Sequence, residues 1–237
     1  MPAWTGEMIS AYLEIKQCVI DAGFAAEIDW QDQQRIDQVT EPELLGEVSW
    51  VILSSGMREK VIRRIFEPFS RAMLDWESAK AIWSRRKSCT ARASQIFNHQ
   101  GKIAGILAFV EHVNNQGFAS TIVRISENGH EFLQGFPYLG PATSLHLAKN
   151  LGLDVVKPDR HLCRIAQAAG ADSPNALCEG IAEAVGDRLN VVDVVLWRYA
   201  TLMPDYLERF RTRGDGDHDG ASAAQDGTGS SFGPGGG

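Results

Sequence analysis

The feature that most constrains this chain is its helical periodicity. Apolar residues recur every three to four positions through most of the sequence up to about residue 203, and no alternating strand pattern extends beyond a few residues. In 58–74 an apolar stripe from Val61 to Met73 runs beside a basic one, and Pro68 predicts a kink or an end there. The pattern therefore predicts an all-α fold with helices at about 7–22, 41–53, 58–74, 88–99, 102–114, 126–134, 141–151, 159–169, 174–185 and 190–203.

Composition divides the chain into two parts. Residues 1–210 have the make-up of a globular helical domain, whereas 211–237 are rich in Gly, Ser, Ala and Asp, which predicts a disordered tail. No apolar run is long enough to span a bilayer and no signal-peptide pattern precedes the domain, so we expect a cytoplasmic protein without a membrane partner. The spacing of the four cysteines favours buried free thiols over disulfides or a metal cluster: Cys18, Cys89, Cys163 and Cys178.

The net charge of −7 hides a strong asymmetry. Residues 1–57 carry ten acidic and two basic side chains, whereas residues 58–102 carry eleven basic and four acidic ones. A basic block inside an acidic protein can attract a polyanion such as DNA. Solvated helix faces are the alternative interpretation of the same block.

Two helix starts lie close together in 136–165. The sequence FPYLGPATS predicts a tight hairpin followed by a helix, because Gly140 gives conformational freedom and Pro141 suits a first helical turn. The start of a helix offers unpaired amides and a positive dipole end, which favour a phosphate. Thr143 can add a hydroxyl group. An ordinary helical connection is the alternative.

Asp159 begins the second helix. The seven residues from Gly152 to Pro158 can reach back far enough to return the chain to the side of the hairpin, so Asp159 is expected near the same surface. As an isolated residue, Asp159 could be a simple N-cap. Beside a phosphate site, a carboxylate fits a reaction in which positive charge develops, such as the oxocarbenium character of a sugar losing its base.

These residues resemble the helix-hairpin-helix DNA glycosylase superfamily, the group that includes endonuclease III and the alkyladenine glycosylases. The family hairpin L-P-G-x-G-x-x-T-A is similar to 136–144, and the family segment V-D-T-H-V-x-R-V is similar to 158–165. The resemblance covers about 40–205. It implies a two-lobed helical fold with a DNA cleft between the lobes, double-stranded DNA as partner, a monomer, base flipping, and Asp159 as the catalytic residue.

The departures from the family pattern also carry predictions. Ala142 stands where bifunctional members have a lysine nucleophile, which implies a monofunctional enzyme that leaves an abasic site. Tyr138 replaces the first hairpin glycine, so either the hairpin is reshaped or the ring contacts DNA. The four-cysteine cluster motif is missing, and no cofactor or metal is implied apart from a monovalent cation at the hairpin. The hairpin residues expected to contact DNA are Tyr138, Gly140, Ala142 and Thr143.

The family's DNA-wedging loop falls on 55–57. Met57 could fill the gap left by a flipped base or could pack in the core, and Ser55 lies beside Gly56 at the wedge position. Phosphate contacts are assigned to Arg58 and Lys60. The candidate aromatic residues for a base pocket are Trp30, Trp50, Trp76, Trp83, Phe136 and Tyr138.

The resemblance leaves the excised base open. An alkylated or deaminated base would make the protein a repair enzyme, whereas a modified cytosine in phage DNA, such as a glucosylated hydroxymethylcytosine, would make it an antiviral defence factor. A non-catalytic DNA-binding module and a helical protein-interaction scaffold are the competing hypotheses.

Overall fold

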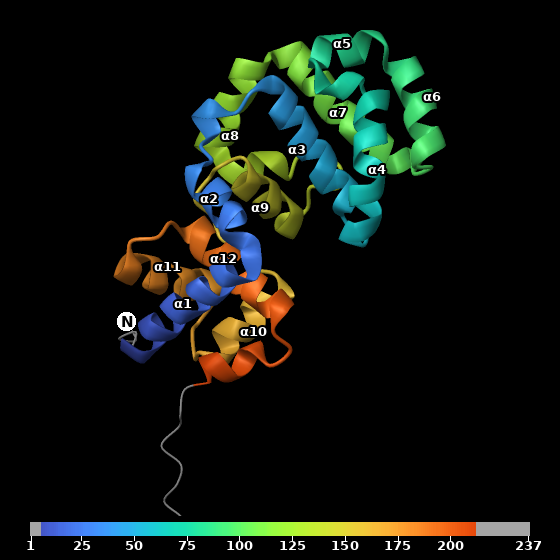
Figure 1. The fold of residues 1–237 in the computed structure, drawn as a ribbon. Coiled ribbons are helices and arrows are strands. Elements are labelled where there is room, and N and C mark those ends of the chain that lie inside the picture. The colour runs from blue at the N-terminus through green and yellow to red at the C-terminus, as the bar shows by residue number, and fades with distance from the viewer. Residues whose placement is uncertain (1–5, 212–237) are drawn as a thin grey trace, which may run out of the picture.

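The structure, a computed structural model, describes residues 6–211 (Figure 1). Every regular element in this range is helical, which confirms the all-α prediction for it; the predicted tail lies outside the described residues apart from Arg211. The elements are α1 (Gly6–Val19), η1 (Ile20–Phe24), α2 (Ala25–Gln33), η2 (Ile36–Gln38), α3 (Glu41–Ser54), α4 (Glu59–Ala72), η3 (Leu74–Trp76), α5 (Ala79–Ser84), α6 (Arg86–Ile96), α7 (Gln100–Gln116), α8 (Phe118–Leu133), α9 (Pro141–Asn150), α10 (Arg160–Ala168), α11 (Pro174–Val185), α12 (Leu189–Leu202) and η4 (Tyr206–Phe210).

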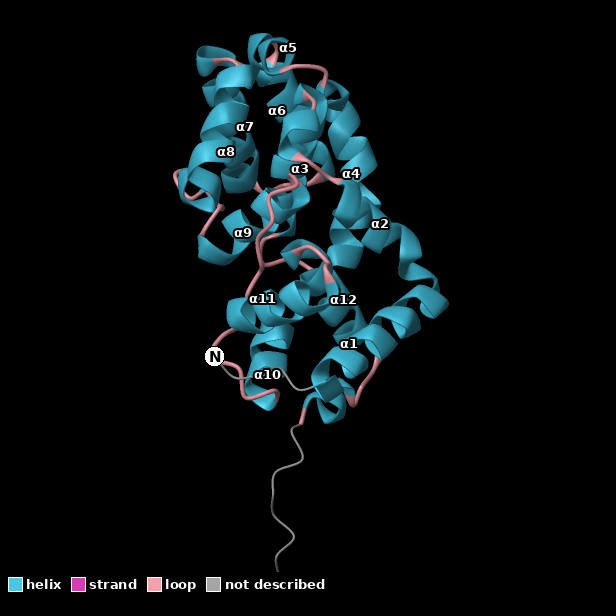
Figure 2. Ribbon diagram, turned by 90° about the vertical axis from the view of Figure 1, so that its left-hand side faces the viewer, coloured by secondary structure: helices cyan, strands magenta, loops and turns pink. Residues whose placement is uncertain are grey.

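Two separate hydrophobic cores organise these helices. Residues from Val39 to Leu151 form one core, carried by α3–α9, which we call the middle lobe. Residues from both ends of the described chain form the other core, carried by α1, α2, α10–α12 and η4, which we call the terminal lobe. Figures 1 and 2 show the two groups of helices one above the other.

The lobes are joined by partly buried hydrogen bonds from a side chain to the backbone. The guanidinium of Arg188, just before α12, donates hydrogen bonds to the carbonyl oxygens of Gln34 at 3.0 Å and Gly152 at 2.9 Å. Gly152 adopts a φ of +92°, and a Cβ there would lie 2.7 Å from the Cα of Arg35. Only glycine therefore permits this close approach between the two chain segments.

The helix boundaries differ from the sequence-based ones in several places. The segment α8 begins at Phe118 rather than near 126, and α2 and α5 were not predicted. The helix α4 runs through Pro68 to Ala72. Proline removes one amide donor, and the fully buried Ile62 and Phe69 on either side of it hold the helix in the core.

Two further sequence-based expectations can be compared with the fold. Cys89 and Cys178 are buried free thiols, whereas Cys163 is exposed and Cys18 is partly exposed, so the prediction of buried thiols was wrong for those two. Over residues 6–211, no helix is both long enough and apolar enough to cross a bilayer.

Candidate functional site

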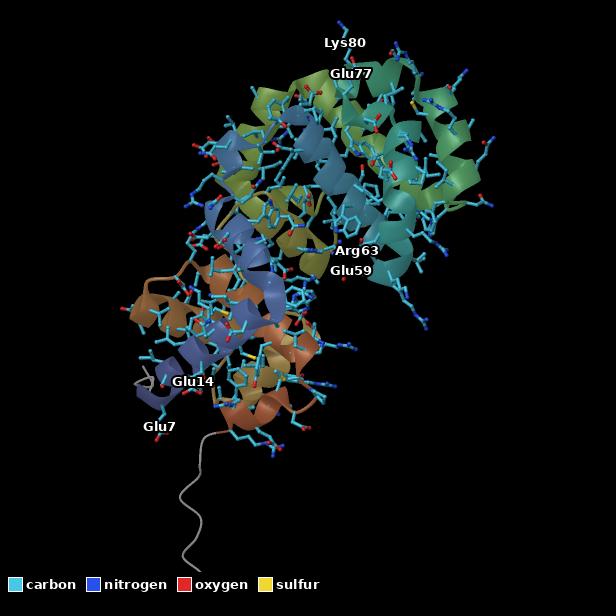
Figure 3. All side chains as sticks on the ribbon, viewed as in Figure 1. Glu7, Glu14, Glu59, Arg63, Glu77 and Lys80 are labelled. Carbon is cyan, nitrogen blue, oxygen red and sulfur yellow. The ribbon has the colours of Figure 1, made fainter. Side chains whose placement is uncertain are left out.

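A cleft of about 730 Å³ lies where the two lobes meet. Its walls come from α2, α3, α4 and α9, from the segment before α10, and from α12. Figure 3 shows Glu59 and Arg63, two of the lining residues, at the end of α4 that faces the terminal lobe. The cleft is within the size range of small-molecule and cofactor sites in proteins.

Asp159 lines this cleft as the N-cap of α10. Its Oδ1 accepts hydrogen bonds from the backbone amides of His161 at 2.8 Å and Leu162 at 3.0 Å. Its Oδ2 has no hydrogen-bond partner among the described residues. Asp159 is thus an N-cap, as the simpler interpretation had it, and it also keeps one carboxylate oxygen available to a ligand.

The hairpin between α8 and α9 brings Ala142 and Thr143 to the same cleft, while Gly140 is exposed outside its lining. The hydroxyl group of Thr143 is near the carbonyl oxygens of Tyr138 at 2.9 Å and Gly140 at 3.2 Å. It donates to them and closes the hairpin. The start of α9 and the carboxylate of Asp159 therefore border one cavity, as the chain-reach estimate predicted.

Tyr138 lies outside the cleft lining. It has a φ of +66°, the left-handed conformation that glycine adopts at low cost, so the hairpin keeps a glycine-like backbone there. Its ring packs over Gly101 and Gly105 of α7 and meets His99 edge-on, with 37% of the residue exposed. The small α7 residues explain how a tyrosine is accommodated: a Cβ at Gly101 would be 2.3 Å from the phenol oxygen.

The loop between α3 and α4 forms another rim of the cleft. Ser55, Gly56 and Met57 all line it, and Gly56 has a φ of +68°. Met57 is 38% exposed, so it does not pack in the core. The ammonium group of Lys102 donates to the carbonyl oxygens of Leu53 at 2.6 Å and Ser55 at 2.5 Å. These bonds give a donor to backbone carbonyl groups at the C-terminal end of α3, and they hold the start of the loop in place.

The basic block is mostly a surface feature. Arg58 and Lys60 are exposed at the start of α4, next to the cleft but not among its lining residues. Lys102 is the exception, because it is only 3% exposed and its ammonium group is hydrogen-bonded to the carbonyl oxygen of Leu53 in α3. Lys102 therefore belongs to the basic block in the sequence but not to its exposed surface.

Buried charges at the base of the cleft were missed by the sequence interpretation. Lys149 of α9 forms an ion pair with Asp193 of α12, and their side chains are 9% and 2% exposed. The second oxygen of Asp193 accepts the backbone amide of Lys157 at 2.6 Å, which anchors the segment leading to Asp159. The sequence did contain a sign of this pair: Asp193 is a lone acid inside the apolar run VVDVVLW, and a buried acid needs a buried partner.

Two other titratable groups line the cleft with shifted pKa values. Burial, followed by the charges of Lys157 and Lys149, lowers the pKa of His146 to about 3, so its imidazole is neutral at pH 7. Burial raises the pKa of Glu47, whose carboxyl group accepts a hydrogen bond from the Asn150 amide at 2.9 Å. The neutral imidazole of His146 thus offers an uncharged hydrogen-bonding position to a ligand.

Aromatic side chains complete the walls. Trp30 and Trp50, both predicted candidates, line the cleft, together with Trp197 and Phe66, which were not predicted. Arg63 lies 5.6 Å from the ring centre of Trp50, and Arg198 lies 4.6 Å from that of Trp197. The remaining candidates are not among the lining residues: Trp76, Trp83, Phe136 and Tyr138.

Within the described part of the chain, no group of three or more His, Cys, Asp or Glu side chains could hold a metal ion. The expectation of a monovalent cation at the hairpin stays a prediction. No family model matches the chain, and no curated protein or solved structure matches it significantly.

Proposed function

We propose that this protein is a monofunctional DNA glycosylase of the helix-hairpin-helix type, acting on double-stranded DNA as a monomer. The observation that carries the proposal is the position of Asp159. Its free Oδ2 borders the same cleft as the start of α9 and the 55–57 loop. A carboxylate, a phosphate-binding helix start and an exposed apolar side chain on one cavity are the parts that base excision requires.

In the proposed mechanism the hairpin binds the DNA backbone and the target nucleotide rotates into the cleft. The α9 amides and the exposed Arg58 and Lys60 contact phosphates. Met57, exposed at the rim, fills the space left in the duplex. Flipping requires a few kcal/mol of unstacking, roughly, which these contacts offset.

Asp159 then acts in the chemical step, the cleavage of the C1′–N bond. As the C1′–N bond breaks, positive charge develops on the deoxyribose, and the Oδ2 oxygen stabilises it and accepts a proton from the attacking water. Ala142 presents no amine at the start of α9, so no Schiff base forms there. The product is an abasic site in an intact strand.

The test compares wild type with Asp159→Asn on a panel of modified DNAs that includes alkylated, deaminated and phage genomic DNA. Asparagine is also a good N-cap, so α10 should keep its start. We expect base release by the wild type, revealed as abasic sites by alkali, and a loss of roughly 10²-fold or more in the variant.

Three results would contradict the proposal. Equal base release by both proteins would remove Asp159 from the mechanism. Strand cleavage without alkali, with a borohydride-trapped adduct, would contradict the monofunctional assignment. Salt-dependent DNA binding without any base release would favour a non-catalytic DNA-binding module.

A further inference from the structure

Three of the four cationic side chains that line the cleft are paired with a carboxylate. Of the four lysine and arginine side chains there, Arg63 pairs with Glu59 at 2.6 Å, Arg198 pairs with Glu27 at 2.7 Å, and Lys149 pairs with Asp193. The ammonium group of Lys157 forms no ion pair and no hydrogen bond with any described residue. Lys157 is therefore the cleft cation left for a ligand.

Lys157 lines the same cleft as Asp159, and the Asp159 carboxylate is near enough to act on the charge of the Lys157 ammonium group. It lies two residues before Asp159, on the segment whose backbone Asp193 anchors. Its side chain is partly buried and lines the cleft. Burial and the nearby Lys149 lower its pKa, although Asp159, Asp193 and Glu59 act in the opposite direction. An ammonium group with a lowered pKa is a stronger proton donor than an ordinary lysine.

We propose that Lys157 is a second catalytic residue, which stabilises and protonates the departing base while Asp159 acts on the sugar and water. This step rests on the proposed glycosylase function. The C1′–N bond breaks with its electron pair moving to the base, and Lys157 donates a proton to a base heteroatom. Water supplies the oxygen bonded to C1′ and gives its proton to Asp159. Proton return from Asp159 to Lys157 through solvent completes the cycle, so the net reaction consumes one water.

The same arrangement defines the class of base. A base that is uncharged in DNA leaves as an anion unless it is protonated, so a cation at its edge stabilises the departing base. A base that already carries a positive charge, such as N7-methylguanine, leaves as a neutral molecule and would be repelled by Lys157. The faces of Trp50 and Trp197 already have Arg63 and Arg198 beside them, which leaves less room for a cation–π contact with a charged base. The substrate is therefore an uncharged base with a hydrogen-bond acceptor.

A phosphate contact is the competing role for Lys157, and kinetics separates the two. A residue that acts on the leaving base changes the rate of the chemical step, whereas a phosphate contact changes the DNA affinity and its salt dependence. Lys157→Met removes the ammonium group but keeps the backbone amide that Asp193 accepts. Lys157→Arg keeps the charge without an easily lost proton. Lys80→Met is the matched control, because Lys80 is exposed on α5, away from the cleft (Figure 3).

The experiment measures single-turnover base release and DNA affinity on the modified DNA that the wild type processes, and base release from DNA treated with methyl methanesulfonate. We expect Lys157→Met to slow release by roughly 10²-fold, with an unchanged Kd and salt slope. Lys157→Arg should retain an intermediate rate, and Lys80→Met should match the wild type. The wild type should release no N7-methylguanine. Circular dichroism checks that each variant folds.

The outcomes distinguish this proposal from the proposed function. A wild type that releases bases while Lys157→Met is equally fast overturns the role of Lys157 alone. So does a weaker Kd with a salt slope reduced by about one, which identifies a phosphate contact. Efficient release of N7-methylguanine overturns the substrate class. If the wild type releases no base from any DNA, the glycosylase function fails, and the role of Lys157 fails with it. If Lys157→Met does not fold, the rate of Lys157→Arg decides, since a wild-type rate there excludes proton donation.

Discussion

The buried ion pair between Lys149 and Asp193 gives the sharpest stability prediction. It joins α9 of the middle lobe to α12 of the terminal lobe, and both side chains are almost fully excluded from solvent. Removing one partner of such a pair leaves an uncompensated buried charge, which costs about 3–5 kcal/mol. Asp193→Asn leaves the Lys149 cation unpaired but keeps an oxygen that can accept the Lys157 amide.

The double variant Lys149→Met/Asp193→Asn removes both charges and should recover most of the loss. The expected single-variant cost corresponds to a decrease in Tm of roughly 6–20 °C, at about 2–4 °C per kcal/mol for a domain of this size. The assay is urea and thermal unfolding of wild type, both single variants and the double variant. A double-mutant cycle then gives the coupling energy directly.

A coupling energy below about 1 kcal/mol would refute this reasoning, because that value is typical of a solvent-screened surface pair. Exposed pairs in the same protein provide the internal comparison. Glu67 and Arg71, whose side chains are 78% and 60% exposed, form such a pair on α4. Replacing either of them should change the stability by no more than about 0.5 kcal/mol.

Two further predictions concern the neighbourhood of the cleft. Because the pKa of His146 falls from 6.5 to about 3 on folding, the unfolded chain binds a proton first as the pH drops, and about 4–5 kcal/mol of stability is lost between those two pH values. His146→Gln should flatten the dependence of Tm on pH over that interval, and an unchanged slope would contradict the shift. Lys102→Met should cost about 2 kcal/mol in urea unfolding, since it removes two hydrogen bonds at the end of α3, whereas Lys87→Met at an exposed position should cost almost nothing. Equal stability of the two variants would show that Lys102 does not hold the 55–57 loop.

Local sequence signals predicted the elements that depend on local physics. The helix predicted at about 41–53 is α3, and the structure shows that it begins with a capping box in which the Glu43 carboxylate accepts the Thr40 amide at 2.8 Å. Asp159 caps α10, and Pro141 opens α9. In each case the residue satisfies or replaces amides within one helical turn, so its effect needs no distant partner.

Elements that depend on distant packing were the ones misjudged. Pro68 was expected to kink or end its helix, and an end at Pro68 was wrong, because α4 continues to Ala72 with Ile62 and Phe69 buried in the middle lobe. Lys102 belongs to the basic block 58–102, for which solvated helix faces or DNA contacts were expected, yet it is buried and donates to the carbonyl oxygen of Ser55 at the end of α3, 47 positions earlier in the chain. Nothing in the residues around Lys102 shows where that helix end will lie.

Local patterns along the chain were enough to predict the helical class, the helix starts at Pro141 and Asp159, and a segment long enough to return Asp159 to the hairpin. Which charges meet in the cleft depends instead on how the two lobes pack. Lys149 and Asp193 are separated by 44 positions, and their pairing leaves Lys157 as a cleft cation with no ion pair to any residue within 6–211. The physical reason is range: capping acts within a turn, whereas the pairing of buried charges depends on how two lobes pack, and that packing is a property of the whole chain.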